Sequence, residues 1–150
     1  MRRRHDSIIV QKISKLLIPF IQLFALYVFF HGHHSPGGGF QAGVLIGASF
    51  ILMFLVGMKK ETQHFSVRRE FLIAVLGLGI FLGIGAVSLF FGGELFDYSK
   101  IPFLGEVAPY RRYFGILIAE GGVLLVVSMT LVVITHVLAF LPVDREGETC

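Results

Sequence analysis

The chain has 150 residues, of which 55% are hydrophobic and only 15% are charged, a composition too apolar for an ordinary soluble domain of this size. Its net charge is +3, and its single cysteine, Cys150, stands at the last position, which excludes an internal disulfide framework. The apolar residues gather in four long runs, so we expect an all-α polytopic membrane protein that forms one domain over residues 1–150.

The four apolar runs predict four transmembrane helices, because a helix crosses a bilayer with about 20 apolar residues. The predicted spans cover about residues 13–31, 40–58, 71–91 and 114–141. Three arginines precede the first run, as in a secretory signal peptide. That run is too long for a signal peptide and no small-residue cleavage site follows it, so we interpret it as the first span. Four spans in so short a chain would form a thin bundle, with much of its surface facing lipid or other proteins.

The distribution of basic residues predicts the orientation of the spans. Ten of the thirteen Lys and Arg residues fall on the side that holds both termini and the loop 59–69, whereas Lys100, Arg111 and Arg112 fall on the other side. By the positive-inside rule, both termini are expected in the cytoplasm.

A glycine-rich stretch, residues 32–47, joins the first two spans. Proline at 36 and glycine at 37–39 cannot belong to an ordinary helix interior. Within hydrocarbon, non-helical backbone survives only where protein or a water-filled cavity satisfies its polar groups. The stretch is therefore either a surface turn or a backbone surface shaped for close packing. The spaced pairs Gly43/Gly47 and Gly79/Gly83 would likewise allow close approach, either within this chain or against neighbouring subunits.

The longest loop, residues 92–112, is expected to lie along the outer surface, and its pattern predicts no regular structure. Tyr98, Tyr110 and Tyr113 suit the aromatic belt found at a membrane interface.

Glu120 is the only carboxylate within the predicted spans, and two glycines follow it. A carboxylate at such a depth is costly and should face the protein interior or water, which favours a proton or cation path. The alternative is a structural hydrogen bond to a neighbouring helix. Apart from Lys15, which lies at the end of the first span, no second carboxylate or lysine lies in another predicted span, so a proton partner is expected from another protein.

The histidines do not predict a metal or haem site. His31, His33 and His34 have no Cys, Asp or Glu nearby, and adjacent histidines diverge. We expect interfacial histidines that bond to the backbone. His136 lies about 24 Å along its helix from Glu120, so the two are not a local pair.

The remaining polar groups suggest packing rather than ligand binding. Gln22 and Gln41 are expected to bond neighbouring helices rather than an ion. The triglycine lacks the preceding strand and the following Lys-Ser/Thr of a phosphate-binding loop, and no nucleic-acid partner is expected.

Two motifs carry a resemblance that covers essentially the whole chain. The first motif is Gly32-His33-x-x-Pro36-Gly37-Gly38-Gly39-Phe40-Gln41-x-Gly43. It resembles the signature of the MnhB or MrpB family, whose members are small subunits of multisubunit cation/proton antiporters. Ile118-Ala119-Glu120-Gly121-Gly122-Val123 looks like the family's second motif. The chain departs from the expected pattern at Ala42 and Gly122.

The resemblance implies a non-catalytic subunit of a complex in the prokaryotic plasma membrane that exchanges Na⁺ for H⁺. The implied host is a stand-alone Mrp complex or the antiporter module of a complex I-related enzyme, such as a membrane-bound hydrogenase or sulfane reductase. The implied partners are the other subunits and membrane lipids. The chain lacks the cysteine sets of iron–sulfur clusters, so we expect no cofactor and no enzymatic activity of its own.

Three other functions stay open from the sequence. The chain could be a self-sufficient homodimeric transporter in which two copies of Glu120 form the site. It could be a purely structural assembly subunit without ion contact. It could also anchor a haem or metal enzyme in the membrane.

Overall fold

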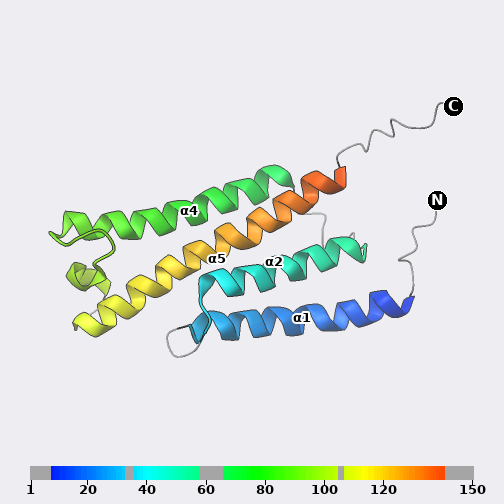
Figure 1. The fold of residues 1–150 in the computed structure, drawn as a ribbon, viewed down its shortest axis with the longest axis horizontal. Helices are drawn as coiled ribbons and strands as arrows, with labels where there is room; N and C mark the ends of the chain where they lie inside the picture. The colour runs from blue at the N-terminus through cyan, green and yellow to red at the C-terminus, as the bar shows by residue number, and fades with distance from the viewer. Residues whose placement is uncertain (1–7, 33–35, 58–65, 105–106, 141–150) are drawn as a thin grey trace.

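The computed structural model describes residues 8–32, 36–57, 66–104 and 107–140 (Figure 1). Its elements are α1 (Ile8–Phe30), α2 (Gly39–Leu55), α4 (Val67–Phe90), η1 (Tyr98–Lys100), η2 (Pro102–Leu104) and α5 (Ala108–Phe140). The described part of the chain is thus all-helical, as predicted. His33 and Cys150 lie outside the described residues.

Helices α1, α4 and α5 are long and apolar enough to cross a membrane. Helix α2 is apolar but has 17 residues, which gives a length of about 26 Å, somewhat short of the roughly 30 Å hydrocarbon core. These helices make the chain a membrane protein, whereas four complete crossings remain a prediction. Helices α1, α4 and α5 begin four to six residues before the predicted spans, because hydropathy marks only the apolar part of a helix that continues through charged residues such as Arg68 and Arg111.

The helices form an open row rather than a closed bundle (Figure 1). Extensive contacts join α4 to α5, α5 to α2, and α2 to α1. The beginning of α1 and the end of α5 lie on the same side of this row, at the right of Figure 1. Only 17% of the residues in the apolar windows of α1 and α4, and 28% in that of α5, are buried. Most apolar side chains of the row therefore face lipid or other protein.

A polar contact joins α1 to α2. Gln22 Nε2 donates to Ser49 Oγ over 3.2 Å, and Ser49 Oγ donates to the Ile46 carbonyl over 2.7 Å. Ser49 is fully buried. The expected helix-to-helix bond of Gln22 is therefore confirmed, whereas the side chain of Gln41 is exposed.

The segment between α4 and α5 folds back over these two helices. The Phe96 ring lies against the backbone of Gly85, and the Tyr98 ring lies against that of Gly115. Ile101 is fully buried, and it forms a small core with Tyr98, Ile84 and Ala119. Tyr98 is therefore a core residue and not, as predicted, part of an interfacial belt, although Tyr110 is exposed.

Candidate functional site

The glycine-rich turn packs directly against Glu120. Glu120 lies about 18 Å along α5 from the first residue of that helix. A Cβ atom placed on Gly38 would lie 3.1 Å from Glu120 Oε1, and one on Gly39 would lie 2.7 Å from the Glu120 carbonyl carbon. The turn and the acidic residue, which the sequence shows as two separate motifs, thus form one site.

Glycine is required here for two different reasons. Gly38 has a φ of 106°, a backbone conformation that residues with a Cβ atom rarely adopt. Its N–H donates to the Val28 carbonyl over 3.3 Å, which ties the turn to the end of α1. Gly39 is the first residue of α2, and any side chain on it would collide with the Glu120 backbone.

The Glu120 carboxylate lies at the N-terminus of α2. Gly38 is the N-cap of α2, and no side chain caps this helix end. The first backbone N–H groups of a helix lack intrahelical partners, and the helix dipole favours a negative charge there by about 0.3–1 kcal/mol. The structure therefore places the acidic group beside the open N-terminal end of α2.

One oxygen of this carboxylate is left unpaired by the part of the chain that the structure describes. Oε2 of Glu120 is buried and makes no hydrogen bond to any group in the described part of the chain. A buried polar oxygen left without a partner costs about 1–3 kcal/mol. This oxygen is therefore available to a proton, a cation or a donor from another chain.

Helices α1 and α4 complete the surroundings of Glu120. A Cβ atom on Gly122 would lie 2.7 Å from the Gly77 carbonyl oxygen, so α4 packs closely there. The nearest atom to the corresponding position of Gly121 belongs to the Phe29 ring of α1, at 3.8 Å. The departure from the expected family pattern at Gly122 thus coincides with this close α4–α5 approach.

The glycine pairs divide between contacts within the chain and open surface. Gly43 packs against Leu124 of α5, and Gly47 packs against Ser128 and Leu131. By contrast, a Cβ atom on Gly79 or Gly83 would meet nothing within 4 Å in the described structure. The pair on α2 therefore joins two helices of this chain, whereas the pair on α4 is open to lipid or to another subunit.

The motif around the turn also has two sides. Gly37 packs against the Val28 carbonyl. Pro36, Phe40 and Gln41 are exposed, with Phe40 63% accessible. The glycines therefore form the inner surface that meets α1 and α5, and these three side chains lie on the outside of the row.

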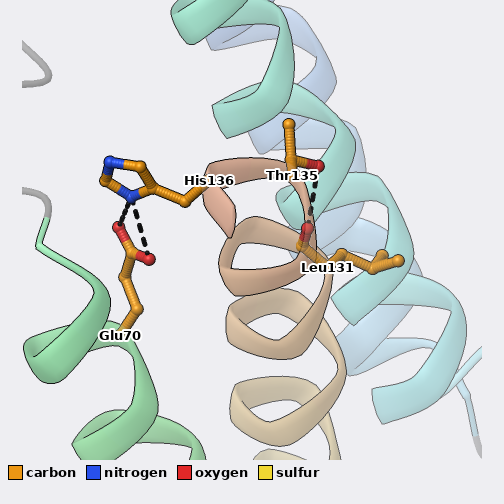
Figure 2. A network of polar contacts seen from close by, with 4 residues as sticks. All are labelled: Glu70, Leu131, Thr135 and His136. Carbon is orange, nitrogen blue, oxygen red and sulfur yellow. Dashed lines mark hydrogen bonds and ion pairs between the residues drawn. The ribbon is translucent and has the colours of Figure 1, made fainter. Parts of the chain in front are cut away.

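A second buried acidic group joins the ends of α4 and α5 (Figure 2). Oε1 and Oε2 of Glu70 lie 2.9 and 3.2 Å from Nδ1 of His136. The side chain of Glu70 is 2% exposed and that of His136 13%. Glu70 belongs to the first turn of α4, and His136 lies close to the C-terminal end of α5.

This pair corrects two expectations. Glu120 is not the only carboxylate within the long helices, because α4 begins at Val67 and includes Glu70. His136 bonds a carboxylate, whereas backbone bonds were expected. The signal in the sequence is Glu70 itself, which directly precedes the apolar run from Phe71. Hydropathy alone does not extend the helix back to this charged residue.

His31 behaves as an interfacial histidine. Its Nδ1 donates to the Tyr27 carbonyl over 3.1 Å, and its ring stacks on Tyr27 with centroids 4.1 Å apart. Within residues 8–32, 36–57, 66–104 and 107–140, no three His, Cys, Asp or Glu side chains gather as metal ligands would.

The comparison with known families agrees with the two motifs. A family profile described as "Domain related to MnhB subunit of Na+/H+ antiporter" matches residues 9–133. Proteins named "Putative antiporter subunit mnhB2" from Staphylococcus aureus strains Newman, JH1 and COL are each 29% identical over 136 residues, covering 85% of this chain and 96% of theirs. The chain therefore belongs to the MnhB family of Na⁺/H⁺ antiporter subunits.

Proposed function

We propose that this chain is a non-catalytic subunit of a multisubunit Na⁺/H⁺ antiporter, and that Glu120 holds a proton or Na⁺ on its path through the complex. The observation that carries the proposal is Oε2 of Glu120, which is buried without a partner among the described residues at the end of a helix that favours negative charge. A purely structural carboxylate would be expected to bond a neighbouring helix.

The open row of helices supports the need for partner subunits. Large apolar side chains are exposed along α1 and α4, and the glycines at 79 and 83 leave one part of α4 without side-chain cover. Small residues let membrane helices approach closely. Other subunits and lipid would cover these surfaces. The exposed Phe40 and Gln41 would then meet a partner, whereas Gly38 and Gly39 act within this chain.

We further propose that both termini lie in the cytoplasm of a prokaryotic cell. The positive-inside rule predicts this orientation, and it is compatible with the beginning of α1 and the end of α5 lying on the same side of the row (Figure 1). A reporter fused to the C-terminus should therefore be active only inside the cell, and activity outside would overturn the orientation.

The test of the central proposal is Glu120→Gln in the intact complex. This change keeps the size of the side chain but removes its charge. The complex should assemble as before, and Na⁺-driven proton movement in everted membrane vesicles should fall by about tenfold or more. Ser128→Ala is the matched control. Ser128 lies on the same helix as Glu120, and its hydroxyl donates a hydrogen bond to the Leu125 carbonyl of that helix.

Normal exchange by the Glu120→Gln complex would assign Glu120 a structural role and favour the assembly subunit. Exchange by the purified chain alone in liposomes would favour the homodimeric transporter. Identification of the subunits that co-purify would distinguish a stand-alone antiporter from the antiporter module of a hydrogenase.

A further inference from the structure

The ends of α4 and α5 hold a second ionisable site that the path through Glu120 does not use. It consists of Glu70 and His136, whose atoms Oε1 and Nδ1 are 2.9 Å apart (Figure 2). Glu70 lies where α4 begins and His136 lies close to where α5 ends, and these two helix ends lie on the same side of the row (Figure 1). His136 is about 24 Å along α5 from Glu120. The pair is therefore too far from Glu120 to be part of the same site.

A buried ionisable pair in a membrane helix row is poorly explained by stability alone. Removing an ionised group from water costs several kcal/mol, and well-packed apolar residues often stabilise a protein as much as a buried ionisable pair or more. Ionisable groups within membrane helices more often mark paths for ions or protons. The long contact between α4 and α5 already has close packing at Gly77 and Gly122.

The pair has charged and aromatic neighbours within the described part of the chain. Glu70 lies in the first turn of α4, and His136 lies near the C-terminal end of α5. The nearest charged neighbours on α4, Arg68 and Arg69, are exposed. Helix α2 contributes the Phe54 ring, with its centroid 5.2 Å from that of His136. Helix α1, whose basic residues are Lys12 and Lys15, packs against α2.

We propose that Glu70 and His136 form a proton-exchange site at this end of the chain. His136 is the more exposed member of the pair, and its Nε2 atom faces away from Glu70 (Figure 2). A hydrated proton from the aqueous phase binds Nε2 of neutral His136. The Nδ1–H proton then passes to Oε1 of Glu70. The products are a neutral imidazole protonated at Nε2 and a carboxylic acid that donates to Nδ1, so the pair gains one proton and loses one negative charge.

The test uses the whole complex and two variants that keep a hydrogen bond but cannot exchange the proton. These are Glu70→Gln and His136→Asn, whose amide groups replace the carboxylate and the Nδ1 position. Each should lower Na⁺-driven proton movement in everted vesicles by about tenfold and flatten its dependence on pH. The double exchange Glu70→His with His136→Glu should recover part of the activity, because it restores an exchangeable pair.

Thr135→Val is the matched control. Thr135 is next to His136, and its hydroxyl bonds to the Leu131 carbonyl of its own helix, over 2.9 Å (Figure 2). This variant perturbs the same turn of α5 without removing an ionisable group, so its activity and pH profile should match those of the unmodified complex.

A second measurement does not depend on antiport. Infrared difference spectra of the complex after a pH step should show a carboxyl band that Glu70→Gln removes and His136→Asn shifts. If one of the two variant complexes fails to assemble, the carboxyl band measured in the other variant complex tests the proposal. Unchanged exchange with an unchanged pH profile in Glu70→Gln, or the absence of a Glu70-dependent band, would overturn the proposal. If the unmodified complex exchanges no Na⁺, the proposed function fails while the band still tests this site.

Discussion

Gly39→Ala should weaken the contact between α2 and α5 more than any other single-methyl change at the turn. The added methyl group would lie 2.7 Å from the carbonyl carbon and 2.9 Å from the Cα atom of Glu120. These neighbours are backbone atoms, so no side chain can rotate away. Ordinary contacts of this kind begin at 3.4 Å, and the Glu120 carbonyl oxygen would lie closer to the methyl group than either of these carbon atoms. The two helices must therefore separate locally by more than about 0.7 Å.

The expected cost of Gly39→Ala is about 1–3 kcal/mol, as for other overpacked sites. The matched control is Gly79→Ala. Gly79 is also helical, but a Cβ atom there meets nothing within 4 Å in the described structure, and alanine is the better helix former by up to about 1 kcal/mol. The complex carrying Gly79→Ala should therefore be as stable as the unmodified complex, unless a partner subunit packs on this glycine.

The assay is thermal unfolding of the purified complex, together with Na⁺-driven proton movement in vesicles. Gly39→Ala should lower the unfolding temperature and reduce exchange, because the helix end that faces the Glu120 carboxylate is displaced. Equal unfolding temperatures for Gly39→Ala and the unmodified complex would refute the close packing of the turn on Glu120. A larger loss for Gly79→Ala would instead show that the open face of α4 is an interface with another subunit.

Three further predictions concern the rest of the chain. Phe96→Ala should destabilise the complex by about 2 kcal/mol or more, because the Phe96 ring packs on Gly85 and Phe81. The side chain of Phe90 is 88% exposed, so the control Phe90→Ala should destabilise the complex less unless a partner subunit covers this ring. Gln22→Leu should cost about 0.5–1.5 kcal/mol through loss of the bond to Ser49, as thermal unfolding would show, and an unchanged midpoint would contradict that bond. The Ser99 hydroxyl holds the pKa of Asp97 below its ordinary value, so this hydrogen bond stabilises the fold when the pH is above the ordinary pKa, and the stabilisation is lost as the pH falls through the lowered pKa. Ser99→Ala should raise the pKa of Asp97 in a ¹³C NMR titration, and an unchanged pKa would count against the hydrogen bond.

The amino-acid sequence alone determined the class of the protein, the approximate positions of the helices and the family. These properties depend on runs of neighbouring residues, because about 20 apolar residues make a membrane helix wherever the chain places them. Glu120 was recognised for the same reason, since its charge interrupts an apolar run. The glycines at 37–39 were recognised as unfit for a helix interior.

Only the tertiary structure decided which of these features meet. The sequence did not show what the glycine-rich turn packs against, and in the structure Gly38 and Gly39 pack on Glu120 of the same chain. The pairing of Glu70 with His136 and the return of Phe96 and Tyr98 onto α4 and α5 could not be predicted either. Helix periodicity gives the face on which a residue lies, but not which helix packs on that face. In this chain, α5 packs against α2 and α4 at glycines whose lack of a side chain allows the backbones to approach closely. The contact between α4 and α5 also includes the buried pair of Glu70 and His136.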